Sequence, residues 1–107
     1  MTANEYQKLA LRTASELSKK DKLLNGVMGL NGEAGECIDI VKKTLFQGHE
    51  LDNGKLKDEL SDVMWYVALI CTALNINLED VMIYNIEKLK KRYPNGFESE
   101  KSINRKE

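Results

Sequence analysis

The run DELSDVMWYVALIC, residues 58–71, has an acidic first half and an almost wholly apolar second half. Its apolar residues recur at helical spacing and predict a helix from about Gly54 to Leu74. The apolar part is too short to cross a bilayer, which requires about 20 residues. We expect a helix that is apolar on nearly all sides to lie at the centre of a domain or against a second subunit.

Three further helices are predicted around this one, and strand patterns are almost absent, so the expected fold class is all-α. Thr2 and Glu5 form a capping box for the first helix, and Asn77 is the expected N-cap of the last. Pro94 ends the last helix, because the residue before a proline disfavours helical geometry. The three predicted helices run from Thr2 to about Leu17, from Lys22 to Phe46, and from Leu78 to Lys91.

We expect these helices to form one four-helix bundle-like domain over residues 1–94, followed by a loose polar tail at residues 95–107. Apolar stripes at helical spacing predict which side chains the bundle buries. In the second helix these are Leu23, Val27, Leu30, Ala34, Cys37, Val41 and Leu45; in the last they are Val81, Met82, Ile86 and Leu89.

Length and composition narrow the classes of function. A chain of 107 residues forms one domain, and its net charge of −1 with 31% charged residues gives no field that favours nucleic acid. No apolar run is long enough to place the chain in a membrane, and the first residues lack the pattern of a secretory signal. Cys37 and Cys71 lie within helical patterns and are expected to be reduced thiols. The expected location is the cytoplasm.

Two acidic motifs, Glu33-Ala-Gly-Glu36 and Glu59-Leu-Ser-Asp62, lie on consecutive predicted helices. Residues three apart on a helix differ by only about 60° around its axis, so each motif points two carboxylates the same way. Both pairs border the apolar stripes, and four converging anions repel each other unless a cation binds between them. The other interpretation is that they are surface charges paired with lysines. Those lysines would be Lys42, Lys43, Lys55 and Lys57.

The ligand types favour Mg²⁺ or Mn²⁺, because both prefer oxygen, whereas zinc prefers nitrogen and sulfur. A carboxylate-bridged di-iron bundle requires Glu-x-x-His pairs from two helices. His49 is the only histidine, and it lies in a predicted loop. The sequence therefore excludes that di-iron arrangement.

Four glycines, Gly26, Gly29, Gly32 and Gly35, recur every three residues beside the first acidic motif. Each one costs up to about 1 kcal/mol relative to alanine in a helix interior. One interpretation is that another backbone or a ligand approaches closely at these positions. The alternative is a frayed or kinked start to the helix.

On the last predicted helix, Asn85, Lys88 and Arg92 share one face at spacings of three and seven. An amide and two cations on one face suit phosphate oxygens that a metal leaves exposed. The alternative is a basic last turn that complements the helix dipole. That alternative explains Arg92 but not Asn85.

Taken together, these motifs resemble the MazG-type nucleotide pyrophosphohydrolases of the all-α NTP pyrophosphatase superfamily. The resemblance covers about residues 5–97. It is carried by an E-x-x-E motif followed by E-x-x-D, and by the ending N-x-x-K-x-x-x-R-Y-P. The matching segments are 29–36, 42–43, 58–66 and 85–94.

The resemblance implies an enzyme that converts a nucleoside triphosphate to a monophosphate and pyrophosphate, assembled as a dimer or tetramer whose sites draw on two subunits. It implies that Mg²⁺ is held in the catalytic centre by Glu33, Glu36, Glu59 and Asp62. It also implies that substrate is contacted by Lys43, Tyr66, Asn85, Lys88 and Arg92. Some relatives carry a base-stacking tryptophan near the position of Lys43, and this chain does not, so base preference does not carry over. The alternative function is a catalytically inactive helical module that binds nucleotide or a protein partner.

Overall fold

A computed structural model describes residues 1–106 of the chain, and this part contains helices and no strands. The expected all-α class is therefore confirmed. The elements are α1 (Ala3–Ala10), a 3₁₀ turn η1 (Leu11–Thr13), α2 (Lys19–Phe46), α3 (Asn53–Ala73), α4 (Leu78–Arg92) and α5 (Ser99–Ile103).

Side-chain caps fix where the first three helices begin. Thr2, Ser18 and Asp52 precede α1, α2 and α3, and each side chain accepts the backbone N–H three residues later, at 3.1, 3.2 and 2.9 Å. Such caps satisfy N–H groups that have no partner within the helix. The cap at Thr2 was predicted. The cap at Ser18 starts α2 at Lys19, three residues before the predicted start at Lys22.

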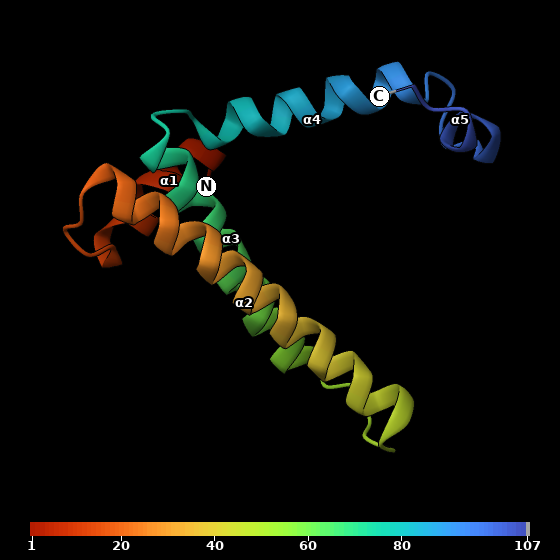
Figure 1. The fold of residues 1–107 in the computed structure, drawn as a ribbon, viewed down its shortest axis with the longest axis horizontal. Coiled ribbons are helices and arrows are strands. Elements are labelled where there is room, and N and C mark those ends of the chain that lie inside the picture. The colour runs from red at the N-terminus through yellow and green to blue at the C-terminus, as the bar shows by residue number, and fades with distance from the viewer. Residues whose placement is uncertain (107) are drawn as a thin grey trace.

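The long helices α2 and α3 form an antiparallel hairpin, as Figure 1 shows. Helix α1 packs at the end of this hairpin away from the connecting loop, while α4 departs from α3 at a bend of 104° and carries α5 at its far end (Figure 1). The radius of gyration is 16.9 Å, against about 13 Å for a compact chain of this length. A four-helix bundle is therefore not closed within one chain, because α4 does not lie along the hairpin. The short helix α5 forms within the predicted tail.

The core lies where α1, α3 and the start of α4 meet. The buried apolar residues are Ala68, Leu69, Cys71, Ala73 and Leu78. Trp65 ties α1 to this core, because its indole N–H donates to the Ala10 carbonyl oxygen and the Thr13 hydroxyl, both at 3.0 Å. The central position predicted for α3 is confirmed for its carboxyl-terminal half.

The predicted buried stripes of α2 and α4 are wrong in large part. Val27 and Leu45 of α2 are 52% and 68% exposed, and Met82 and Ile86 of α4 are 53% and 52% exposed. Helix α2 turns Gly26, Gly29 and Glu33 toward α3. Within residues 1–106, no helix packs along the exposed apolar side of α4. The first helix is shorter than the predicted range from Thr2 to about Leu17, because α1 ends at Ala10 and η1 follows.

Among residues 1–106, no single helix has both the length and the apolar character of a membrane span.

Candidate metal centre

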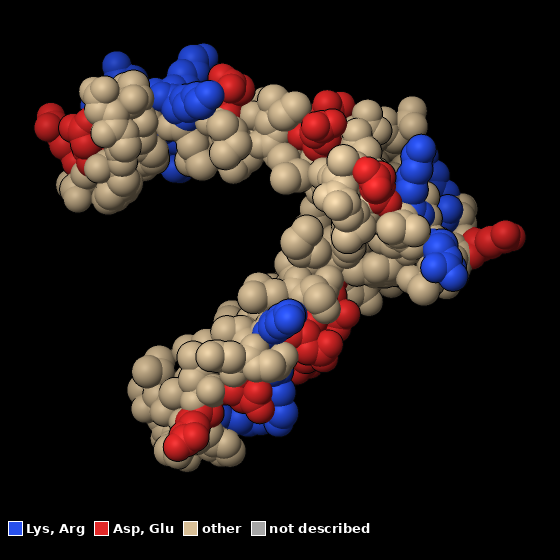
Figure 2. Space-filling view, turned by 180° about the vertical axis from the view of Figure 1, so that it is seen from behind, with Lys and Arg blue, Asp and Glu red and all other residues tan. Residues whose placement is uncertain are grey.

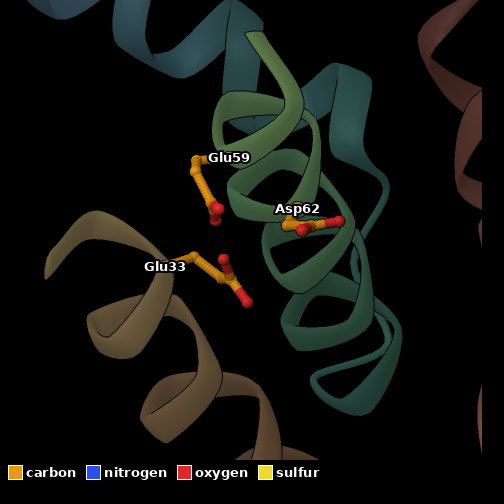
Figure 3. A group of neighbouring side chains, drawn as sticks. All are labelled: Glu33, Glu59 and Asp62. Carbon is orange, nitrogen blue, oxygen red and sulfur yellow. The ribbon is translucent and has the colours of Figure 1, made fainter. Parts of the chain in front are cut away.

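Three of the four predicted acids meet between the two hairpin helices. Glu33 on α2 faces Glu59 and Asp62 on α3, as Figure 3 shows. One carboxylate oxygen from each residue lies within 4.8 Å of the others, and all three side chains are partly buried. The predicted convergence of acids from two consecutive helices is thus present for this trio, which we call the acidic trio.

Two glycines on α2 let α3 approach closely enough to form the trio. A methyl group added at Gly26 would lie 2.6 Å from Cγ1 of Ile70, and one added at Gly29 would overlap the ring of Tyr66. Helix α2 is continuous through this region, so the interpretation as a frayed helix start is wrong. Close approach is confirmed at Gly26 and Gly29. Nothing lies within 4 Å of a methyl group built at Gly32 or Gly35.

The acidic trio is electrostatically unfavourable without a cation. The pKa of Glu59 is raised above its ordinary value, first by a hydrogen bond with the Glu33 carboxyl group, then by desolvation and the negative charges of Glu33 and Asp58. A raised pKa means that the surroundings disfavour the charged carboxylate. Within residues 1–106 the lysine ion pairs join Lys43 to Asp39 and Lys90 to Glu87, so lysines do not neutralise the trio.

The donor set of the trio fits a hard divalent cation. It offers carboxylate oxygens without nitrogen or sulfur ligands, which suits Mg²⁺ or Mn²⁺ better than zinc. A cation at this position would offset the charge repulsion from Glu33 and Asp58 that contributes to the raised pKa of Glu59. The acidic trio could therefore hold a metal ion.

The remaining predicted residues of the hairpin lie outside the trio. Glu36, one turn beyond Glu33, is exposed and does not belong to this group of neighbouring acids. Lys43 pairs with Asp39 at 3.2 Å. Tyr66 follows Asp62 by one turn, fills the space beside Gly29 and contacts the ring of Trp65 edge to face, with centroids 5.1 Å apart.

The predicted phosphate-binding residues, Asn85, Lys88 and Arg92, lie on α4 and away from the trio within one chain. Lys88 and Arg92 border an open depression together with Tyr84, Glu87 and Lys91. Figure 2 shows basic side chains gathered near the end of the arm formed by α4 and α5, across a wide hollow from the hairpin. The structure therefore separates the acidic and basic halves of the predicted site within a single protomer.

One residue near the trio was missed as a site residue. The pKa of Tyr6 is raised, first by desolvation and then by the negative charge of Asp62, so α1 brings its phenol into the electrostatic neighbourhood of the trio. Tyr6 lies within the first predicted helix, where no sequence motif marks it as a site residue. Its relation to Asp62 depends on how α1 packs against α3, and no local pattern signals that packing.

Comparisons with known proteins identify the family of the chain. The sequence model of the MazG nucleotide pyrophosphohydrolase domain matches residues 23–97, a segment that includes the acidic trio and Glu36. The Gene 37 protein of Mycobacterium phage L5 is 41% identical over 73 residues. That alignment covers 64% of this chain and 64% of the phage protein, so the chain spans less than two thirds of that relative's length. No solved structure matches significantly.

Proposed function

Because the chain belongs to the MazG nucleotide pyrophosphohydrolase family, we propose that it hydrolyses nucleoside triphosphates to monophosphate and pyrophosphate. The observation that carries the proposal is the acidic trio, formed by two facing helices inside the segment that the family model matches. The proximity of these carboxylates raises the pKa of Glu59, which means that it disfavours the charged form. A purely structural role does not account for such an arrangement, whereas a bound cation does.

The acidic trio would hold Mg²⁺, or Mn²⁺ in its place, and Glu36 is proposed as a further ligand from the next turn of α2. When bound, such an ion supplies positive charge that offsets the triphosphate and lowers the pKa of a water molecule. Tyr66, packed beside Gly29, lines the nucleotide pocket in this proposal. Lys43 would approach the substrate from α2, and the phenol of Tyr6 closes the side toward α1.

On α4, Asn85, Lys88 and Arg92 would hold phosphate oxygens. The separation of α4 from the hairpin within one chain supports a site built from two protomers, in which α4 of one chain faces the acidic trio of another. The exposed apolar side chains of α4 support the same assembly, because monomeric proteins rarely expose large apolar patches. We therefore propose a homo-oligomer, a dimer or a tetramer.

Light scattering during size-exclusion chromatography is expected to give two or four times the chain mass of 12.2 kDa. Replacing Ile83 and Ile86 together by Glu is expected to shift the protein toward single chains, because both are more than half exposed on α4 in one protomer. The matched control is Lys90→Glu on the same helix. A wild-type protein with the mass of one chain would contradict the proposed assembly.

The activity itself is tested with a panel of canonical and modified ribo- and deoxyribonucleoside triphosphates in the presence of Mg²⁺. We expect release of pyrophosphate and nucleoside monophosphate from at least one of them, and none after chelation of the metal. Release of orthophosphate alone would indicate cleavage of a different bond. Nucleotide binding without turnover would favour the inactive helical module.

A further inference from the structure

Within residues 1–106, the buried polar residue is Gln7, which has 9% of its surface exposed. It projects from α1 into the corner between α3 and α4, where its amide makes three hydrogen bonds. The amide nitrogen donates to the Ile76 carbonyl oxygen at 2.9 Å and to the Thr72 hydroxyl at 3.2 Å. The amide oxygen accepts the Leu78 backbone N–H at 2.8 Å.

These bonds replace a local cap for α4. The N-cap residue Asn77 makes no side-chain capping bond, although the first N–H groups of any helix require partners from outside it. Gln7 satisfies the first of these groups, at Leu78, from a helix about 70 residues earlier in the chain. The same amide holds the carbonyl of Ile76 in the connection between α3 and α4. The side chain of Gln7 therefore bonds to α3, to the connection that follows it and to the first residue of α4.

Within residues 1–106 of one protomer, the contacts that hold α4 lie near this corner. Leu78 is buried, and Asn4 of α1 donates to the Glu79 carboxylate at 3.1 Å, but the later apolar residues of α4 are exposed. A helix of 15 residues is about 22 Å long, so a change of roughly 10° at the corner moves its far end by about 4 Å. That displacement exceeds the length of a hydrogen bond.

We propose that Gln7 is a positioning residue that fixes the direction of α4 and thereby places Asn85, Lys88 and Arg92 for phosphate binding. The inference rests on the proposed function for the role of those three residues, whereas the contribution of Gln7 to the direction of α4 rests on its three hydrogen bonds. Gln7 itself touches neither the acidic trio nor the substrate in this proposal.

The direction of α4 is tested by electron-spin distance measurements. Spin labels are placed through Lys57→Cys on α3 and Lys91→Cys on α4, with Cys37→Ser and Cys71→Ala, and the labelled chain is diluted with unlabelled protein. Gln7→Met removes all three hydrogen bonds and keeps the side-chain length. We expect a distance distribution several ångströms broader than wild type, and no change for Lys8→Met, an exposed control on α1. An unchanged distribution in Gln7→Met overturns the proposal.

Activity provides the second measurement. Gln7→Met is expected to raise KM for the nucleotide about tenfold, the loss of roughly one charge-assisted hydrogen bond, with kcat and the thermal shift caused by Mg²⁺ close to wild type. A broadened distance distribution with an unchanged KM would refute the link to substrate. A fully inactive wild type would refute the proposed function but would leave the distance result valid.

If Gln7→Met does not fold, Gln7→Glu keeps the acceptor for Leu78 and removes the donor to Ile76. An unchanged distribution in that variant also overturns the proposal.

Discussion

Replacing Glu59 by Gln, or Asp62 by Asn, is expected to lower metal-dependent pyrophosphate release by at least about 100-fold. Changes to groups that merely support metal ligands already cost about 10–100-fold, and these two residues are themselves proposed ligands. Both belong to the acidic trio, and either substitution replaces an anionic ligand by a neutral amide, which weakens the binding of a divalent ion. The measurement is a pyrophosphate assay with saturating nucleotide across a series of Mg²⁺ concentrations.

The same variants are expected to lose the stabilisation that Mg²⁺ gives to the folded protein. A ligand at about 100 times its Kd adds about 2.7 kcal/mol to the free energy of unfolding, which corresponds to roughly 10–20 °C in Tm for a domain of this size. Wild type should show this shift, whereas Glu59→Gln and Asp62→Asn should not. Circular dichroism melts with and without Mg²⁺ measure it independently of catalysis.

Without metal, Glu59→Gln is expected to be more stable than wild type at neutral pH. The pKa of Glu59 is higher in the folded protein than in the unfolded chain, so the folded state binds more protons in the interval between the two values. Metal-free wild type therefore loses stability as the pH rises through this interval, and the Gln variant, which cannot ionise, does not. Stability thus increases where activity is lost, which separates a metal-site defect from general misfolding.

Asp58→Asn is the matched control, because Asp58 neighbours Glu59, is exposed and lies outside the acidic trio. It should retain activity and the shift in Tm caused by Mg²⁺. Full activity in both Glu59→Gln and Asp62→Asn would contradict the assignment of the metal centre.

Helix positions were predictable from sequence because they depend on local chemistry. The cap at Thr2 and the end of α4 before Pro94 involve residues within a few positions of each other. The later cap at Ser18 was missed, although the signal of a serine before a helical pattern was present. The residues that each helix buries were predicted much less well, because burial depends on the neighbour. Helix α4 has an amphipathic pattern, yet most of its apolar side chains are exposed in the described part of one chain.

The same distinction between local chemistry and packing applies to the residues of the candidate site. The trio of Glu33, Glu59 and Asp62 could be predicted because helical spacing fixes which carboxylates share a face, and hairpin helices bring those faces together. Tyr6 could not, because its approach to Asp62 depends on how α1 packs. The placement of Asn85 and its neighbours on α4 relative to the trio depends on the bend between α3 and α4, which Gln7 stabilises through contacts distant in sequence.

Gly29→Ala is expected to destabilise the protein by about 1–3 kcal/mol, the usual cost of adding a methyl group to a well-packed interface. The new methyl group would overlap the ring of Tyr66, and we expect α2 to move away from α3 to accommodate it. This movement would also separate Glu33 from Glu59 and Asp62, so the response of Tm to Mg²⁺ should weaken together with stability. Urea unfolding followed by circular dichroism, with and without Mg²⁺, measures both effects.

Gly32→Ala on the same helix is the matched control, and its effect should have the opposite sign. Nothing lies within 4 Å of a methyl group at Gly32, so the substitution should contribute only the higher helix propensity of alanine, a gain of up to about 1 kcal/mol. Comparing the same substitution at these two positions, one turn apart, distinguishes the steric cost of close helix packing from the gain in helix propensity. If Gly29→Ala were also stabilising, α2 and α3 could not be packed as closely as the acidic trio requires.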